Sequence, residues 1–153
     1  MTTTRSISSF SLTAAALLAL AGCTATDGVD PKAVVGPDKI VHHVNDAGAQ
    51  GANTLRNINN HLEINPQAKI VVVAHAQGVD FLFDGAKDRN GNPYNIAVEE
   101  LKGRGVKFDV CDITLRNRQI SKSRFIPEAT YVPSGVVEIA RLQQREGYAY
   151  IRP

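Results

Sequence analysis

The chain has 153 residues, a formal net charge of +2, 43% hydrophobic residues and 21% charged residues. These proportions are ordinary for one globular domain with its own core. The small charge excess and the lack of tryptophan argue against a nucleic-acid-binding protein, which needs a basic surface and aromatic platforms for the bases.

The N-terminal segment resembles an export signal. An apolar stretch, Ser11 to Ala21, is followed by Gly22 and Cys23, and it is too short and alanine-rich for a convincing transmembrane span. Small residues directly before a cysteine are typical of a bacterial lipoprotein signal. We therefore expect residues 1–22 to be the signal peptide and Cys23 to be the lipidated first mature residue. An ordinary secretory peptide and an uncleaved anchor are the alternatives.

A lipid on Cys23 would place the protein on the periplasmic side of a bacterial membrane. Thr24 follows the cysteine where Asp could stand, and similarity to enterobacterial lipoproteins then favours the outer membrane. Residues 24–38 are rich in Thr, Ala, Asp, Gly and Pro without periodicity, so 23–38 is predicted to be a flexible tether. The folded domain is predicted to span 39–153.

The first half of this domain alternates strand and helix patterns. We expect a strand at 39–45, a loop at 46–51, and then a helix with Leu55, Ile58 and Leu62 on one face that stops before Pro66. The apolar run at 69–74 suits a strand buried on both faces of a parallel sheet.

The second half repeats the alternation. The pattern predicts a short helix at 79–83, a turn-rich loop at 88–93, a helix from Tyr94 to Gly103 or Gly105, strands at 106–111 and 130–132, a helix at 135–146 with Ser134 as its N-cap, and a terminal strand at 148–151. Strands that alternate with helices predict a mostly parallel five-stranded sheet in a three-layer α/β/α sandwich.

Three polar or reactive side chains follow the predicted strands. Asn45, His75 and Cys111 lie at the carboxyl ends of the first, second and third strands. Ligands of open parallel sheets bind at this edge, because the loops there vary while the sheet stays rigid. We therefore expect these residues to lie at one edge of the molecule.

Cys111 is the only cysteine besides Cys23, so lipidation would leave it as a free thiol. It precedes a predicted helical turn at 113–116, whose positive end favours a thiolate. Arg116, Arg118 or His75 would add to this effect, and Asp109 and Asp112 would oppose it. The alternative is a buried structural cysteine. His75 is either a proton donor and acceptor beside the thiol or the cap of the helix that follows.

A metal site is not expected. His42 and His43 point to opposite faces of their strand, so they cannot chelate one ion together. Asp88, Asn90, Asn92 and Glu99 match positions of a calcium-binding loop, but Pro93 occupies the position that requires glycine. No glycine-rich phosphate-binding motif is present, so no cofactor is expected.

Several segments taken in order resemble the DsrE/DsrF-like family. These segments are Lys39–Asn45, Val71–His75, Gly105–Phe108, Cys111–Leu115, Val132–Val136 and Gly147–Ile151. The resemblance implies a five-stranded parallel sheet, assembly into trimers or hexamers, and sulfur relay through a cysteine persulfide. Cys111 matches the cysteine of a branch that usually reads Cys-x-Asn-Thr-Leu, with Ile113 in place of that Asn.

Two hypotheses of different classes follow from these residues. In the first, the protein is a sulfur carrier or sulfurtransferase-like protein that holds sulfur on Cys111, with His75 moving protons. The backbone N–H groups of 113–115 would stabilise the anionic sulfur, and Asn45, Thr114 and Leu115 would bind the substrate. A sulfur donor or acceptor protein would be its partner. In the second, it is a non-catalytic, lipid-anchored binding module in which Cys111 only packs. An accessible sulfur beside a pocket would favour the first hypothesis.

Overall fold

The computed structural model describes residues 1–2 and 37–153. Contacts divide the chain into two units, Met1–Asp30 and Pro31–Pro153, and the fold described below is that of the second unit. Residues 3–22 of the predicted signal peptide, Cys23 and the predicted tether up to residue 36 lie outside the described residues. Within the described ranges, no helix is long and apolar enough to cross a membrane.

The second unit is built on one parallel sheet of five strands in the order β4-β3-β2-β1-β5. The strands are β1 (Lys39–Asp46), β2 (Lys69–Gln77), β3 (Lys107–Cys111), β4 (Ala129–Val132) and β5 (Ala149–Ile151). The α-helices are α1 (Ala47–Ile64), α2 (Tyr94–Gly103), α3 (Asp112–Arg118) and α4 (Gly135–Glu146), with short 3₁₀ turns at Gly78–Leu82 and Lys122–Arg124.

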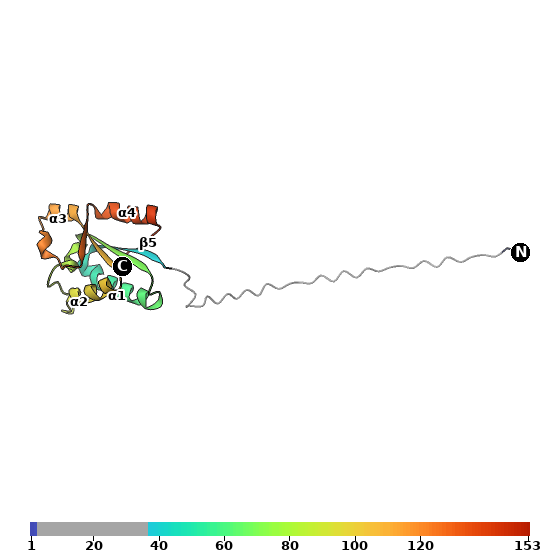
Figure 1. Ribbon diagram of the computed structural model, residues 1–153, viewed down its shortest axis with the longest axis horizontal. Coiled ribbons are helices and arrows are strands. Elements are labelled where there is room, and N and C mark those ends of the chain that lie inside the picture. The colour runs from blue at the N-terminus through green and yellow to red at the C-terminus, as the bar shows by residue number, and fades with distance from the viewer. Residues whose placement is uncertain (3–36) are drawn as a thin grey trace. The chain divides into compact units, whose positions relative to one another are not determined.

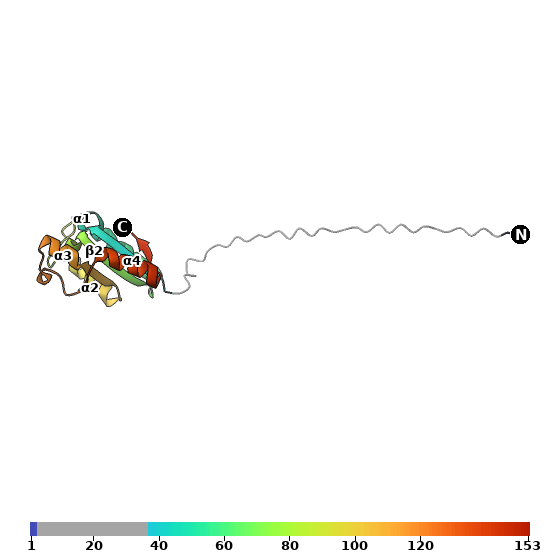
Figure 2. The same cartoon turned by 90° about the horizontal axis from the view of Figure 1, so that it is seen from above.

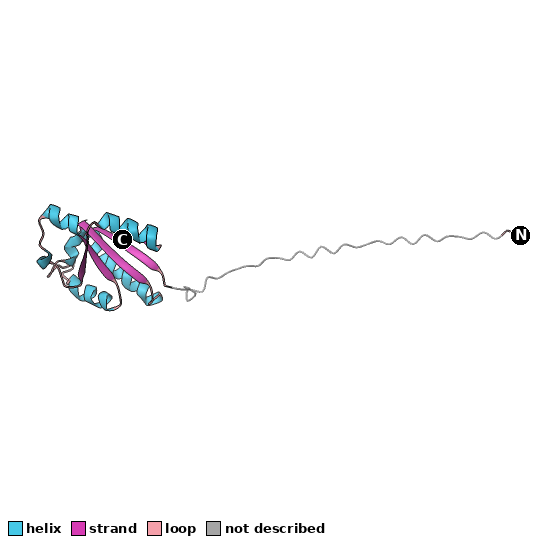
Figure 3. Cartoon of the chain, turned by 45° about the horizontal axis from the view of Figure 1, so that its top comes forward, coloured by secondary structure: helices cyan, strands magenta, loops and turns pink. Residues whose placement is uncertain are grey.

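The helices cover both faces of the sheet. Figure 1 shows α1 and α2 on one side of the strands and α4 on the other, with α3 on the α4 side. The view from above in Figure 2 shows α4 running over the strands, and Figure 3 shows the sheet enclosed between helices. The predicted three-layer α/β sandwich with a parallel five-stranded sheet is confirmed.

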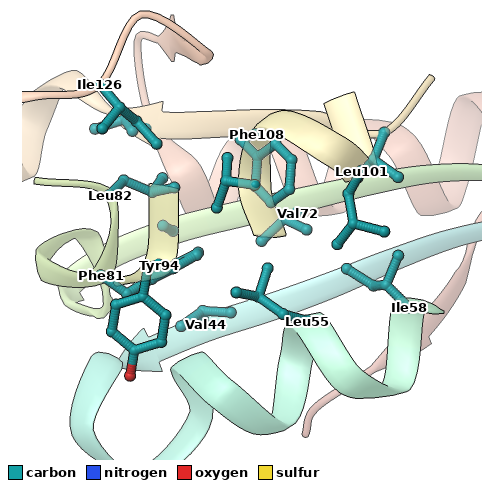
Figure 4. Packing of buried hydrophobic residues seen from close by; sticks show 14 of the residues in the cluster. Val44, Leu55, Ile58, Val72, Phe81, Leu82, Tyr94, Leu101, Phe108 and Ile126 are labelled. Carbon is teal, nitrogen blue, oxygen red and sulfur yellow. The ribbon is translucent and has the colours of Figure 1, made fainter. Parts of the chain in front are cut away.

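Alternation along the strands divides the core in two. Val72 and Phe108 face the α1 and α2 side, where Leu55 and Ile58 of α1 pack against them (Figure 4). Val73, the neighbour of Val72, faces α4 in a second cluster. Each buried aliphatic side chain of this size contributes about 1.5–3 kcal/mol, so both layers hold the sheet in place.

The predicted loop at 46–51 is wrong, because α1 begins at Ala47. Asp46 caps the helix, since its carboxylate accepts a hydrogen bond from the Ala49 N–H. Glycine is a poor helix former, yet Gly51 lies inside α1 and is buried where a Cβ would lie 3.0 Å from the Tyr94 Oη and 3.2 Å from the Phe81 Cβ. Close packing therefore explains a glycine inside this helix.

Candidate functional site at the carboxyl ends of β2 and β3

Cys111 is the last residue of β3 and directly precedes α3. It is 5% exposed. In the register of β2 and β3, Ala74 pairs with Val110, so His75 and Cys111 are the next residues on neighbouring strands. A Cβ placed on Gly135, the first residue of α4, would lie 3.2 Å from the Cys111 Cβ and 3.3 Å from the His75 Cβ. The thiol, the imidazole and the start of α4 therefore meet at one point.

The surroundings of Cys111 favour its thiolate. Burial raises the pKa of the thiol, but hydrogen bonds from the N–H groups of Gly135, Thr114 and Ile113 and from the Thr114 hydroxyl outweigh burial and lower the pKa below its ordinary value. Hydrogen bonds to the charged form are the cause. Neither Arg116 nor Arg118 is among the causes of this shift, and Arg118 is paired with Asp80 at 2.7 Å.

A bulge shapes the end of β2 beside the thiol. The register shifts between Val44 and Asp46 of β1, because Asp46 pairs with Gln77 while Val44 pairs with Ala74. Two residues of β2, His75 and Ala76, therefore lie opposite one residue of β1. Strand β2 extends to Gln77, so the predicted end at residue 74 is wrong and His75 lies inside the strand.

Ala76 adopts a conformation that is rare for a residue with a side chain. Its φ is +51°, in the left-handed region, which costs such a residue roughly 1–2 kcal/mol. The neighbouring element holds it there: the Ala76 N–H donates to the Thr114 Oγ1 at 2.9 Å, and Arg118 donates to the Ala76 carbonyl at 2.8 Å. Bulges and strained residues concentrate at functional sites. Thr114 and Arg118 of helix α3 thus hold the bulge that contains His75 and Ala76.

His75 is the inner member of a chain of hydrogen-bonded side chains. Its Nε2 lies 2.6 Å from the Nε2 of His43, and the Nδ1 of His43 lies 2.6 Å from the Tyr150 hydroxyl. Burial lowers the pKa of both imidazoles, and for His43 the charges of His75 and Arg152 lower it further. Both rings are therefore held neutral at neutral pH.

A pocket of about 680 Å³ opens beside this chain. In the described part of the chain, its lining includes His75, Thr114, Asp80 and Arg118 but not Cys111. The Thr114 hydroxyl also hydrogen-bonds the sulfur of Cys111. The sulfur thus lies next to two of the pocket's lining residues, and it is itself buried.

The structure brings some of the predicted site residues together and separates others. His75 and Thr114 line the pocket, and Cys111 is buried beside them. The Asn45 side chain accepts a hydrogen bond from Arg152 at 3.3 Å, and Asn45 does not line the pocket. The Leu115 side chain is 4% exposed and packs in the core on the α1 side. Of the three backbone N–H groups predicted to face the sulfur, those of Ile113 and Thr114 lower the pKa of Cys111.

Sequence reasoning missed His43, Tyr150 and Gly135. The prediction that His42 and His43 point to opposite faces of β1 is confirmed: His42 is 1% exposed in the core, whereas His43 reaches His75. The alternation of β1 was a usable signal for His43. Tyr150 could be found only from the strand order, which places β5 next to β1.

The calcium-like loop is closed by its own hydrogen bonds. The Asp88 carboxylate accepts from the N–H groups of Asn90 and Asn92, each at 2.8 Å, as turn residues of this type commonly do. Among residues 1–2 and 37–153, no three His, Cys, Asp or Glu side chains are grouped so that they could hold a metal ion.

The fold and site define a parallel α/β sandwich with a buried cysteine at the carboxyl end of β3. The family model of the DsrE/DsrF-like family matches residues 38–153, and the chain belongs to this family. A solved protein of unknown function, MTH1491 from Methanobacterium thermoautotrophicum, is 32% identical over 76% of this chain and 99% of its own, with a TM-score of 0.67.

The ychN protein from E. coli shares the fold, with a TM-score of 0.63 and 20% identity over 76% of this chain and 99% of its own. No curated protein matches the chain.

Proposed function

We propose that the protein is a sulfur carrier that holds sulfane sulfur as a persulfide on Cys111. The observation that carries the proposal is the position of Cys111, which packs against Gly135 at the start of α4 and precedes α3, so that backbone N–H groups of both helices and the Thr114 hydroxyl lower the pKa of the thiol despite its burial. Only the thiolate attacks sulfur.

The transfer has two displacement steps. In the first, the Cys111 thiolate attacks the outer sulfur of a persulfide or polysulfide donor. A new S–S bond forms on Cys111, the donor's S–S bond breaks, and the donor leaves as a thiolate that takes up a proton. In the second, an acceptor thiol loses its proton, and its thiolate attacks the outer sulfur. Cys111 is released as the thiolate, and no external oxidant or reductant is required.

His75 and Thr114 have different roles in this scheme. His75 lines the pocket, so it is the group that would exchange a proton with the donor or acceptor thiol. Thr114 accepts the Ala76 N–H and donates its own hydrogen to the sulfur. Thr114 thereby connects the bulge that contains His75 to the thiol. A sulfur donor or acceptor protein would reach the site through the pocket.

The alternative is a non-catalytic binding module of the same fold. The observation that favours it is the burial of Cys111, which is 5% exposed and lies outside the pocket's lining. In that case the pocket binds a ligand and Cys111 only packs beneath it. The alternative predicts slow alkylation at every pH and no sulfur adduct.

The experiment uses the full chain with Cys23→Ser, in which Cys111 is the sole cysteine. The alkylation rate against pH should show a midpoint below the free-cysteine value of about 8.5. Mass spectrometry after exposure to polysulfide should show added sulfur on Cys111, and Cys111→Ser should take up none. Thr114→Val should raise the midpoint because it removes the hydroxyl, while Thr114→Ser should retain it. A protein that takes up no sulfur would leave the binding module as the better proposal.

We propose further that Cys23 carries lipid and fixes the domain to a bacterial membrane from the periplasmic side, with the outer membrane slightly favoured. The support is the run of small residues before Cys23 behind an apolar stretch. Replacing Cys23 with Ser in cells should release soluble or unprocessed protein, as judged by fractionation. Unchanged processing and membrane retention would contradict the proposal.

A further inference from the structure

We propose that His43 and Tyr150 form, together with His75, a proton relay that carries the proton of the incoming acceptor thiol from the pocket to the solvent at the β5 edge. The inference rests on the proposed sulfur transfer and adds to it the path of the proton. In this scheme His75 is the catalytic residue, since it faces the pocket, and His43 and Tyr150 are positioning and relay residues behind it.

Three neighbouring strands build the relay. His43 pairs with Val73 in the register of β1 and β2, and Tyr150 pairs with Val41 in the register of β1 and β5. The rings of His43 and His75 meet edge to edge through their Nε2 atoms, with centroids 4.7 Å apart and an interplanar angle of 23°. The pairing of β1 with β2 brings the two side chains into this contact.

The outer end of the relay reaches solvent. Tyr150 is 41% exposed, whereas His75 is part-buried at the pocket. The Tyr150 hydroxyl lies 2.6 Å from the Nδ1 of His43. A hydroxyl can accept one proton and donate another, so Tyr150 can receive a proton from His43 and pass its own to water.

A single proton fits between the two Nε2 atoms at 2.6 Å. When both rings are neutral, the ring that donates through Nε2 has no proton on Nδ1, and the ring that accepts through Nε2 must carry its proton on Nδ1. His43 and His75 must then be in opposite tautomeric states. This requirement follows from the contact alone and does not depend on activity.

The two tautomeric arrangements differ by the transfer of one proton along the chain. With His75 protonated on Nε2, its Nδ1 is a free base that can take the proton of an acceptor thiol. The Nε2 proton then moves to His43, the Nδ1 proton of His43 moves to Tyr150, and the tyrosine proton leaves to water. One proton enters, one proton leaves, and every ring ends neutral. Burial disfavours the imidazolium of either ring, which suits a path that avoids this charged form.

The first test examines the tautomers. Long-range proton–nitrogen correlation spectra of the full chain with Cys23→Ser at neutral pH should show one of His43 and His75 as the Nε2–H form and the other as the Nδ1–H form. Tyr150→Phe should leave the opposite pairing intact, since it does not touch the contact between the rings. Two Nε2–H rings would overturn the relay.

The second test measures discharge of sulfur. Protein loaded with polysulfide is mixed with glutathione, and loss of the persulfide is followed by mass spectrometry. His75→Ala should slow discharge by about 100-fold, and His43→Gln and Tyr150→Phe by roughly tenfold, because each breaks proton transfer at a different position. Tyr148→Phe, which removes a hydroxyl two residues away on the same segment, should discharge at the unaltered rate.

A solvent isotope measurement separates a relay from simple packing. In mixtures of water and deuterium oxide, the discharge rate of the unaltered protein should decrease non-linearly with the deuterium fraction, because several protons move together. His43→Gln should give a smaller and linear dependence. If the protein loads with sulfur and His43→Gln and Tyr150→Phe discharge normally, the relay is wrong and the sulfur carrier stands. If the protein does not load, the proposed function itself fails, and the tautomer test still judges the hydrogen-bonded pair.

Discussion

Gly135 determines how closely α4 approaches the thiol. Besides its short distances to Cys111 and His75, a Cβ at this position would lie 3.4 Å from the Val73 Cγ1. All three neighbours belong to strands of one sheet, so none can move away alone. The N–H of the same residue donates to the Cys111 sulfur. The close approach and the hydrogen bond therefore depend on each other.

Gly135→Ala should destabilise the protein and raise the pKa of the Cys111 thiol. We expect a loss of roughly 1–3 kcal/mol, as for other overpacked sites, because the helix must shift and carry its N–H away from the sulfur. Urea unfolding and the pH dependence of alkylation measure the two effects. Gly103→Ala is the matched control: it lies in α2 with nothing within 4 Å of the added Cβ, so it should be neutral or stabilising by up to about 1 kcal/mol. If Gly135→Ala and Gly103→Ala had the same stability and the same thiol pKa, the role assigned to Gly135 would be wrong.

His42 makes the stability of the domain dependent on pH. It is 1% exposed, and neither ring nitrogen has a hydrogen-bond partner among the described residues. Burial, with a smaller effect from His61, lowers the pKa of His42 from 6.5 to about 4. The unfolded chain therefore takes up the proton at a higher pH than the folded chain does.

The contribution of His42 to the free energy of unfolding should be constant above pH 6.5 and fall as the pH is lowered from 6.5 towards about 4. The total loss from this residue is about 3 kcal/mol by linkage. His43 and His75 act in the same direction. His42→Leu should flatten the profile in urea titrations at several pH values, and His61→Gln should keep most of the slope. A slope that His42→Leu leaves unchanged would show that other groups cause it.

At the scale of the element, β2 differs from the neighbouring strands in having a bulge near its carboxyl end. Ala76 holds a left-handed φ inside the bulge. Ala76→Gly should therefore stabilise the protein by about 1 kcal/mol, because glycine adopts this conformation without steric cost. The same substitution at Ala97, inside α2, should destabilise by roughly 0.5–1 kcal/mol. Thermal unfolding of both variants should show that the two substitutions change stability in opposite directions. Destabilisation by Ala76→Gly would mean that the Ala76 methyl contributes more than the strain costs.

The elements could be predicted wherever hydrophobic periodicity was regular. The strand with Val71, Val72 and Val73 and the helix at Gly135–Glu146 are found where the pattern places them. The start of α1 could not be predicted, because Gly51 lowers helix propensity and the contact with Tyr94 that requires it is tertiary.

The candidate site could be predicted only as far as single strands allow. The carboxyl-end rule brought Cys111 and His75 to one edge, since it needs only the direction of each strand. The relay needs the strand order, which places β5 next to β1, and this order is not encoded locally. The bulge that positions His75 also depends on the hydrogen bond from Ala76 to Thr114, two residues that are 38 positions apart in the sequence.

At the scale of the whole molecule, both edges of the sheet and several aliphatic side chains are available for association. Strand β5 is an edge strand, and unpaired strand edges invite a covering partner. Val136 and Val137 on α4 are 59% and 63% exposed. The described surface thus offers apolar area close to the thiol.

We predict that the protein self-associates, with a trimer or hexamer as the form that the family resemblance implies. Sedimentation of the full chain with Cys23→Ser should show species larger than the monomer, because the lipid is then absent and only the protein surface can drive association. Val137→Glu should weaken the assembly if α4 lies in the interface. Ile96→Glu, at a residue of similar exposure on α2 (64%), is the control for surface charge. A monomer at all concentrations would contradict the prediction.

The pairing of β1 with β5 has a consequence for the order in which the domain can be completed. The first strand of the sheet takes its outer neighbour from the last strand of the domain, and such distant pairings slow folding because the intervening chain must be ordered first. While the domain folds, β1, β2 and β3 can pair with one another before β5 adds to the edge of β1. If Cys111 carries sulfur as proposed, its thiol would then exist for a time without Tyr150, the outer end of the proposed relay. A chain truncated before β5 would be the form in which to look for a thiol that passes its sulfur on slowly.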